Sequence, residues 1–228
     1  MAYAIVQQTS VQRTGVTTTT LAYGSDLTAG NLAVVSLTYW QVTISSISWS
    51  VGGSASPSLA VNSHGTDARP AIYYAANTSS GAHTVSITLS SSNDVTMMVH
   101  EYSGCETTTP LDKTETGGGT GTSITTATTT ALAQANNMVH SVVTHESAGT
   151  IDLNAGSGFT RRQHQPNGSS AMPGASEDMG VTATTGVAGT WTAASSVSLW
   201  RAIVAVFKES AGGAPTTRAH RLTLLGSS

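Results

Sequence analysis

The chain has 228 residues, of which only 9% are charged; 9 Lys and Arg against 12 Asp and Glu give a formal net charge of −3. So few basic residues provide no electrostatic footprint for nucleic acid, so we expect no nucleic-acid partner. No stretch approaches the roughly 18 consecutive apolar residues that a membrane span requires, so we expect no membrane span either.

Short β-type segments dominate the chain. Helical periodicity is nearly absent, and runs of β-branched, aromatic and hydroxyl residues recur between clusters of Gly, Asn, Pro and Ser. This pattern predicts an all-β fold, an antiparallel β-sandwich of jelly-roll or concanavalin-like type. The predicted strands are 3–8, 17–23, 31–40, 43–51, 58–62, 70–76, 83–90, 95–103, 122–132, 137–145, 158–165, 177–184, 189–194, 199–208 and 220–225.

The two halves of the sequence resemble each other. Residues 30–36 resemble 136–142, with Asn31 falling on Asn137 at an offset of 106 residues. Tyr102 falls on Phe207 at an offset of 105 when the apolar strands around them are aligned. Two anchors with nearly the same offset predict a duplication of about 105 residues, and a generic β pattern is the alternative.

Composition suggests the domain boundaries. Residues 1–210 are predicted to form the β-sandwich, with halves 1–113 and 122–210. The Gly/Thr-rich segment 114–121 is the predicted linker, or the crossing between the halves of one sandwich. Residues 211–228 are predicted to be a flexible C-terminal tail. Its apolar residues Leu222, Leu224 and Leu225 are candidates for assembly through a neighbour's sheet edge.

Groups suited to catalysis are few. The seven histidines lack metal-ligand spacing, and no carboxylate pair is proposed by a motif, so we predict no catalytic residue, no metal site and no cofactor. Glu101, the one acid inside an apolar strand, is expected at an outward or edge position. Residues 152–156 resemble the opening of a calcium loop, but Gln163 stands where the bidentate Glu would be, which favours a plain turn.

Binding is the more plausible activity. Exposed aromatic side chains stack on sugars or bury into interfaces, and Trp40 and Trp191 are the two tryptophans that we expect to be partly exposed. The lone Cys105 is expected to be a small buried residue rather than a reactive thiol. The first ten residues lack a basic region and a continuous apolar region, so they predict a strand rather than a secretory signal.

Several segments together resemble jelly-roll-type β-sandwich proteins of bacteriophage particles and related bacterial surface proteins. The segments are 28–36, 72–77, 101–104, 109–112, 156–160 and 202–207. The resemblance implies a non-enzymatic structural protein of the virion surface, as a capsid decoration, head fibre or tail-associated protein. Its implied partners are further copies of itself, as a homo-oligomer, and other virion proteins, and its implied location is the virion or the extracellular space.

Two other functions stay open at this point. The first alternative is a carbohydrate-binding, lectin-like module that attaches to surface glycans through Trp40 or Trp191. The second is a polysaccharide-active enzyme on a concanavalin-like sandwich, which requires two acids facing each other in a cleft.

Overall fold

The computed structural model describes residues 2–49, 56–63, 67–166 and 172–211. The described residues contain no helix and form two antiparallel sheets of six strands, which confirms the predicted all-β sandwich. The strands are β1 (Ala4–Ala22), β2 (Leu32–Trp40), β3 (Ile44–Trp49), β4 (Ser58–Asn62), β5 (Ala68–Ala75), β6 (Thr84–Ser103), β7 (Leu111–Thr125), β8 (Asn137–His145), β9 (Leu153–Ala155), β10 (Thr160–Gln165), β11 (Gly174–Val181) and β12 (Thr190–Lys208).

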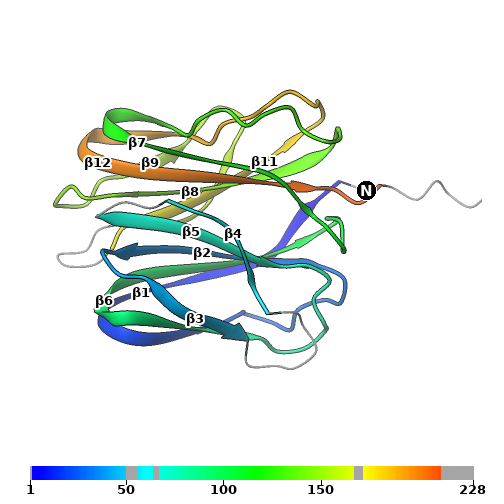
Figure 1. Cartoon of the computed structure of the whole chain (residues 1–228), viewed down its shortest axis with the longest axis horizontal. Helices are drawn as coiled ribbons and strands as arrows, with labels where there is room; N and C mark the ends of the chain where they lie inside the picture. Colours follow the sequence, from blue (N-terminus) through cyan, green and yellow to red (C-terminus); the bar gives the residue numbers. More distant parts are fainter. Residues whose placement is uncertain (1, 50–55, 64–66, 167–171, 212–228) are drawn as a thin grey trace, which may run out of the picture.

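Each half of the chain forms one sheet. Strands β1 to β6 lie in the lower part of Figure 1 and β7 to β12 in the upper part. The first sheet has the order β1-β6-β2-β5-β4, with β3 paired to β6. The second has the order β7-β12-β8-β11-β10, with β9 paired to β12. The strand order of the second sheet therefore repeats that of the first, element by element.

The longest strands of each sheet bend, so that one arm of these strands packs over the rest of the sheet as a second layer. β1 and β6 are paired along 19 and 20 residues, with register shifts between Arg13 and Thr18. At this bend Gly15 has a φ of 60°, a conformation that glycine adopts without strain. The outer arm and the main part of the sheet enclose one apolar core, to which Val85 and Ile87 contribute from the arm and Val35 from β2.

The second sheet bends and begins its strands at corresponding positions. Gly121, 106 residues after Gly15, has a φ of 99° at the register shift between β7 and β12. Before β2, Gly30 has a φ of 86°, and before β8, Asn136 has a φ of 62°, again 106 residues later. The sheets therefore share their turning points as well as their strand order.

The two sheets pack face to face through a common core. Leu32, Val34 and Ile72 of the first sheet meet Met138 and Val142 of the second, and all five are buried. Across this interface β2 faces β8, while β1 contacts β10 and β4 contacts β7. The strand orders therefore run in opposite directions, as expected for two like sheets related by an approximate twofold axis.

Two boundary predictions have different outcomes. The predicted linker 114–121 is wrong, because this segment lies within β7. Its glycines are needed for close packing: a Cβ on Gly119 would lie 2.9 Å from the Trp200 ring, and one on Gly117 would clash with the Thr125 backbone. The predicted strand 220–225 and the tail residues Leu222, Leu224 and Leu225 lie outside the described residues.

Candidate functional site

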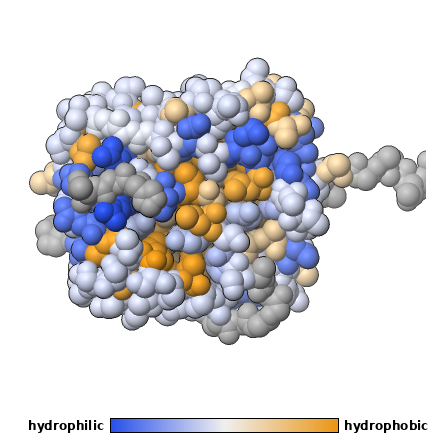
Figure 2. Space-filling model, viewed as in Figure 1, coloured by the Kyte–Doolittle hydropathy of each residue, from blue (hydrophilic) through white to orange (hydrophobic). Residues whose placement is uncertain are grey.

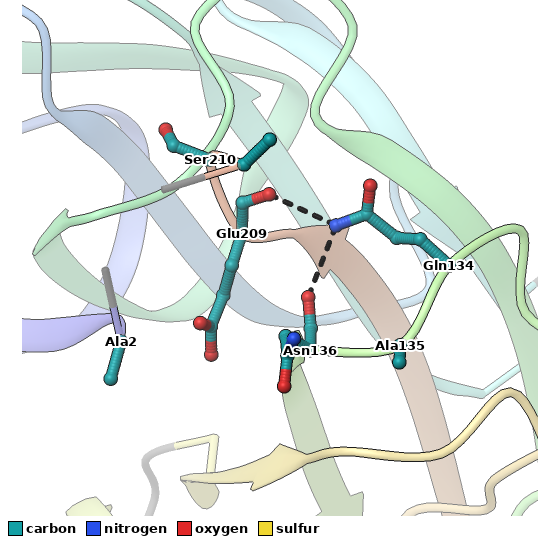
Figure 3. Close-up of a pocket in the computed structure, with 7 residues that line it drawn as sticks. Ala2, Gln134, Ala135, Asn136, Glu209 and Ser210 are labelled. Atoms are coloured by element: carbon teal, nitrogen blue, oxygen red, sulfur yellow. Dashed lines mark hydrogen bonds between the residues drawn. The ribbon is translucent and has the colours of Figure 1, made fainter. Parts of the chain in front are cut away.

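A small polar pocket lies where the second sheet ends near the start of the chain. Its volume is about 400 Å³, and Figure 3 shows the residues that line it: Ala2, Gln134, Ala135, Asn136, Glu209, Ser210 and Ala211. They come from three separate segments: the residue before β1 begins, the turn before β8, and the end of β12. The fold, not local sequence, therefore assembles this pocket.

Backbone hydrogen bonds fix the walls of the pocket. The Glu209 N–H donates to the Asn136 carbonyl at 3.2 Å. Gln134 Nε2 donates to the carbonyls of Asn136 at 3.1 Å and Glu209 at 2.9 Å, and so ties the two segments together. Because these bonds use only the main chain of Asn136 and Glu209, both side chains are left available to the pocket.

The Glu209 carboxylate is the one ionisable group among the pocket residues. The residue is only 9% exposed, yet its carboxylate has no hydrogen-bond or ion-pair partner among the described residues. Figure 3 shows the carboxylate directed into the hollow beside the Asn136 side chain. The stem of Glu209 is thus covered by the protein while its carboxylate lines the pocket, where it is available to accept hydrogen bonds from a ligand.

Cys105 lies close to Glu209 but is not a nucleophile. Their backbones form an isolated β-bridge, and the thiol is buried. Burial, with the negative charges of Glu209 and Asp178, raises the pKa of Cys105 to about 12. The expectation of a buried residue is confirmed, and the raised pKa favours the protonated thiol at neutral pH.

Five coupled polar side chains lie between the two sheets. Tyr102 donates to Asp178 Oδ2 at 2.8 Å, and Arg162 binds the two oxygens of the same carboxylate at 2.7 and 2.8 Å. His140 Nδ1 lies 3.1 Å from the Tyr102 hydroxyl, and the His100 ring contacts that of His140 with centroids 4.8 Å apart. Tyr102, Asp178, His100 and His140 are buried, and the hydrogen bonds of this network join the two sheets.

The structure separates the two predicted tryptophans. Trp40 is half-buried at the end of β2, as expected. The prediction of a partly exposed Trp191 is wrong: the side chain is 2% exposed and donates from Nε1 to Ser141 Oγ at 3.0 Å. It packs inside the second sheet because the strand that carries it alternates, placing Trp191 and Ala193 on the buried side.

Glu101 is also placed differently from the prediction. It is fully buried rather than outward or at an edge. Its carboxylate accepts hydrogen bonds from Gln7 Nε2 and Asn31 Nδ2, both at 2.6 Å, and from the Thr28 N–H at 2.8 Å. Three donors satisfy this charge, so Glu101 holds together the start of β1 and the loop before β2.

Other candidate sites can be located as well. Asp152, in the loop that resembled a calcium site, pairs with Arg161 and with His164 Nδ1, at 2.5 and 3.3 Å. Within the described ranges, no three His, Cys, Asp or Glu side chains are placed to hold a metal ion. The described part of the chain also has no helix long and apolar enough to cross a bilayer.

The polar pocket was missed by sequence reasoning, because its parts are about 70 residues or more apart in the chain. A signal did exist in Asn136, which occupies the position of Gly30 in the proposed repeat and tolerates a positive φ.

Comparison of the chain with protein-family models, curated proteins and solved structures found no match.

Proposed function

We propose that the chain is a non-enzymatic structural protein of an extracellular assembly, a phage virion surface protein that self-associates through the free edge of β4. The observation that carries this proposal is the difference between two edge strands at equivalent positions, β4 and β10. β4 and β10 occupy the same place in their sheets, each pairing with a single neighbour. Among the described residues, groups that protect the edge against further strand pairing are found at β10 and not at β4.

The edge at β10 is protected by charge and by hydrogen bonding. It carries Arg161 and Arg162, and the Arg162 carbonyl accepts a hydrogen bond from Gln8 Nε2 of β1 at 3.0 Å. Gln165 Nε2 adds a bond to Ser10 Oγ at 2.7 Å. Charged side chains and covering groups are how soluble proteins prevent a sheet edge from pairing with another chain.

Within the part of the chain that the structure describes, the edge at β4 has neither charge nor a covering hydrogen bond of this kind. Its sequence, Ser-Leu-Ala-Val-Asn, contains no charge, and Leu59 is 46% exposed. Ala60 and Tyr74 beside it are only partly buried. Figure 2 shows apolar surface gathered in the middle of the face on which β4 and β5 lie. An uncharged edge strand with an exposed Leu is suited to pairing with a second copy or with another virion protein.

The test is the oligomeric state of the purified chain, measured by light scattering over a range of concentrations. We expect concentration-dependent oligomers that Leu59→Lys abolishes without lowering the thermal midpoint. The matched control is Val6→Lys, because Val6 is exposed to a similar extent, 48%, on a different strand. A monomeric wild-type chain at all concentrations would contradict self-association through β4, as would equal loss of oligomers in both variants.

The same measurement separates the tail from the edge. A chain truncated after Ser210 lacks Leu222, Leu224 and Leu225, the assembly residues that the sequence suggests. Oligomers that persist after truncation and disappear in Leu59→Lys support the edge. Oligomers lost only on truncation would contradict it and transfer the assembly role to the tail.

A carbohydrate-binding module is the second candidate. The observation that favours it is the half-buried Trp40 at the end of β2, because a partly exposed indole is the kind of side chain that stacks on sugar rings. Glycan-array binding that Trp40→Ala abolishes would support this function. Binding that Trp40→Ala leaves unchanged would remove Trp40 from any glycan site.

A further inference from the structure

The unpartnered Glu209 carboxylate determines which ligands the polar pocket can hold. Among the described residues, the nearest cation along the chain is Lys208, whose Nζ is already engaged by Glu106 Oε2 at 2.9 Å and by Thr109. In the residues that the structure describes, the pocket therefore has a carboxylate and no cation that neutralises it. The raised pKa of the neighbouring Cys105 thiol, to which Glu209 contributes after burial, is consistent with this charge.

The remaining pocket groups add acceptors and little bulk. The Asn136 side chain is directed toward the same space and supplies an amide oxygen, while Ala2 and Ala135 leave the walls short. A volume of about 400 Å³ is at the small end of ligand sites, large enough for a compact ligand or the end of a long side chain. The carboxylate and the amide oxygen can together satisfy the three N–H donors of an ammonium group.

We propose that the pocket formed by Glu209 and Asn136 binds a primary ammonium group. A divalent cation is a poorer fit, because one carboxylate and one amide supply too few oxygens for calcium and no metal-binding cluster is found among the described residues. An anion would be repelled by the carboxylate. The ammonium group has two sources, a lysine side chain of a partner protein or the free amine of an amino sugar.

This inference does not rest on the assembly proposal, since none of the pocket residues belongs to β4. The pocket and the edge can therefore be tested separately. A result that contradicts ligand binding in the pocket does not contradict self-association through β4, and the reverse also holds.

The experiment is an NMR titration of the full-length chain, following backbone amide shifts. The probes are Nα-acetyl-lysine methylamide and glucosamine, and each is paired with its N-acetylated, uncharged counterpart. We expect saturable shifts at Asn136, Glu209 and Ser210 with at least one amine and none with the acetylated compounds. A response to the lysine derivative alone identifies a protein partner, and a response to glucosamine alone identifies a glycan.

Variants link the shifts to the two side chains. Glu209→Gln keeps the shape and removes the charge, and we expect affinity for the amine to fall at least about tenfold, as for loss of a charge-assisted hydrogen bond. Asn136→Gly keeps the positive φ and removes the amide, so it also weakens binding without straining the turn. Glu115→Gln, which removes the same charge from β7 outside the pocket, should leave affinity unchanged.

Three results would overturn the proposal. The first is no saturable shift with either amine in the millimolar range. The second is equal binding of the acetylated compounds, which would show that the positive charge is not recognised. The third is a Glu209→Gln variant that keeps a native spectrum and the affinity of the wild type.

Discussion

His140, which lies between the two sheets, should make the folding stability of the protein fall at acidic pH. His140 Nε2 lies 2.7 Å from Ser36 Oγ, and Nδ1 lies 3.1 Å from the Tyr102 hydroxyl. Burial lowers the pKa of His140 to about 4; the Asp178 carboxylate opposes this shift and the Arg162 charge adds to it. The ring is therefore neutral at pH 7, and it can be protonated in the folded protein only at considerable cost.

The size of the effect follows from the two pKa values. In the unfolded chain His140 takes up a proton near its usual pKa of 6.5, whereas in the folded protein it does so only near 4. Stability is therefore unaffected above pH 6.5, falls by about 1.4 kcal/mol per pH unit below it, and levels off near pH 4. The total loss from His140 is about 3 kcal/mol. His100, whose pKa burial also lowers, contributes in the same direction.

Urea unfolding, followed by tryptophan fluorescence at a series of pH values, measures this loss. The comparison is with His140→Gln, which cannot titrate but keeps a polar group toward Ser36. Every other ionisable group is present in both proteins, so the difference between the two stability profiles reports His140 together with its coupling to His100, whose pKa the His140 charge lowers. We expect that difference to change by about 3 kcal/mol between pH 6.5 and pH 4. Parallel profiles would refute the buried, neutral state of the ring.

Three further substitutions have expected results in the same unfolding assay. Burial raises the pKa of Glu177 to about 9, so the folded protein loses stability as the pH rises from 4.5 toward 9. Glu177→Gln should remove this pH dependence and stabilise the chain by about 3 kcal/mol at pH 7. A variant whose stability changes with pH in parallel with the wild type would contradict this expectation. Glu101→Gln sets an amide against a donor and should cost about 2 kcal/mol; an unchanged urea midpoint would show that its three bonds contribute little. Trp191→Phe loses the bond to Ser141 and leaves a small void, for a loss of about 2 kcal/mol, and a neutral result would contradict this packing.

Periodicity was sufficient to predict most of the strands. The predicted strands 58–62 and 137–145 coincide with β4 and β8, because each is a compact run bounded by turn residues. The predicted pairs 3–8 with 17–23 and 83–90 with 95–103 are the two arms of β1 and β6, which bend without ending. Hydrophobic pattern alone does not show such a bend, because the arms stay hydrogen-bonded through the shifts in register.

Composition was misleading where tertiary packing decides. The glycines of 114–121 suggested a flexible linker, but Gly117 and Gly119 are packed so closely by backbone or a neighbouring side chain that a Cβ would not fit, and Gly121 has a φ of 99°. Glu101 suggested a surface position, but its three donors come from Gln7, Thr28 and Asn31, 70 or more residues away in the chain. Long-range partners of this kind cannot be identified from the sequence of one strand.

The interface between the sheets brings equivalent positions of the two halves together, and it also shows where the halves differ. Tyr102 and Phe207 occupy equivalent positions 105 residues apart, and Tyr74 and Asp178 are equivalent at 104. On one side Tyr102 donates to Asp178 at 2.8 Å; on the other Tyr74 meets the Phe207 ring edge to face, with centroids 5.4 Å apart. The same contact between equivalent strands is thus polar once and apolar once. If the two halves were identical, both contacts would be of the same kind. Because only one of them is a hydrogen bond to a buried charge, each half needs the particular partner residues that the other half carries.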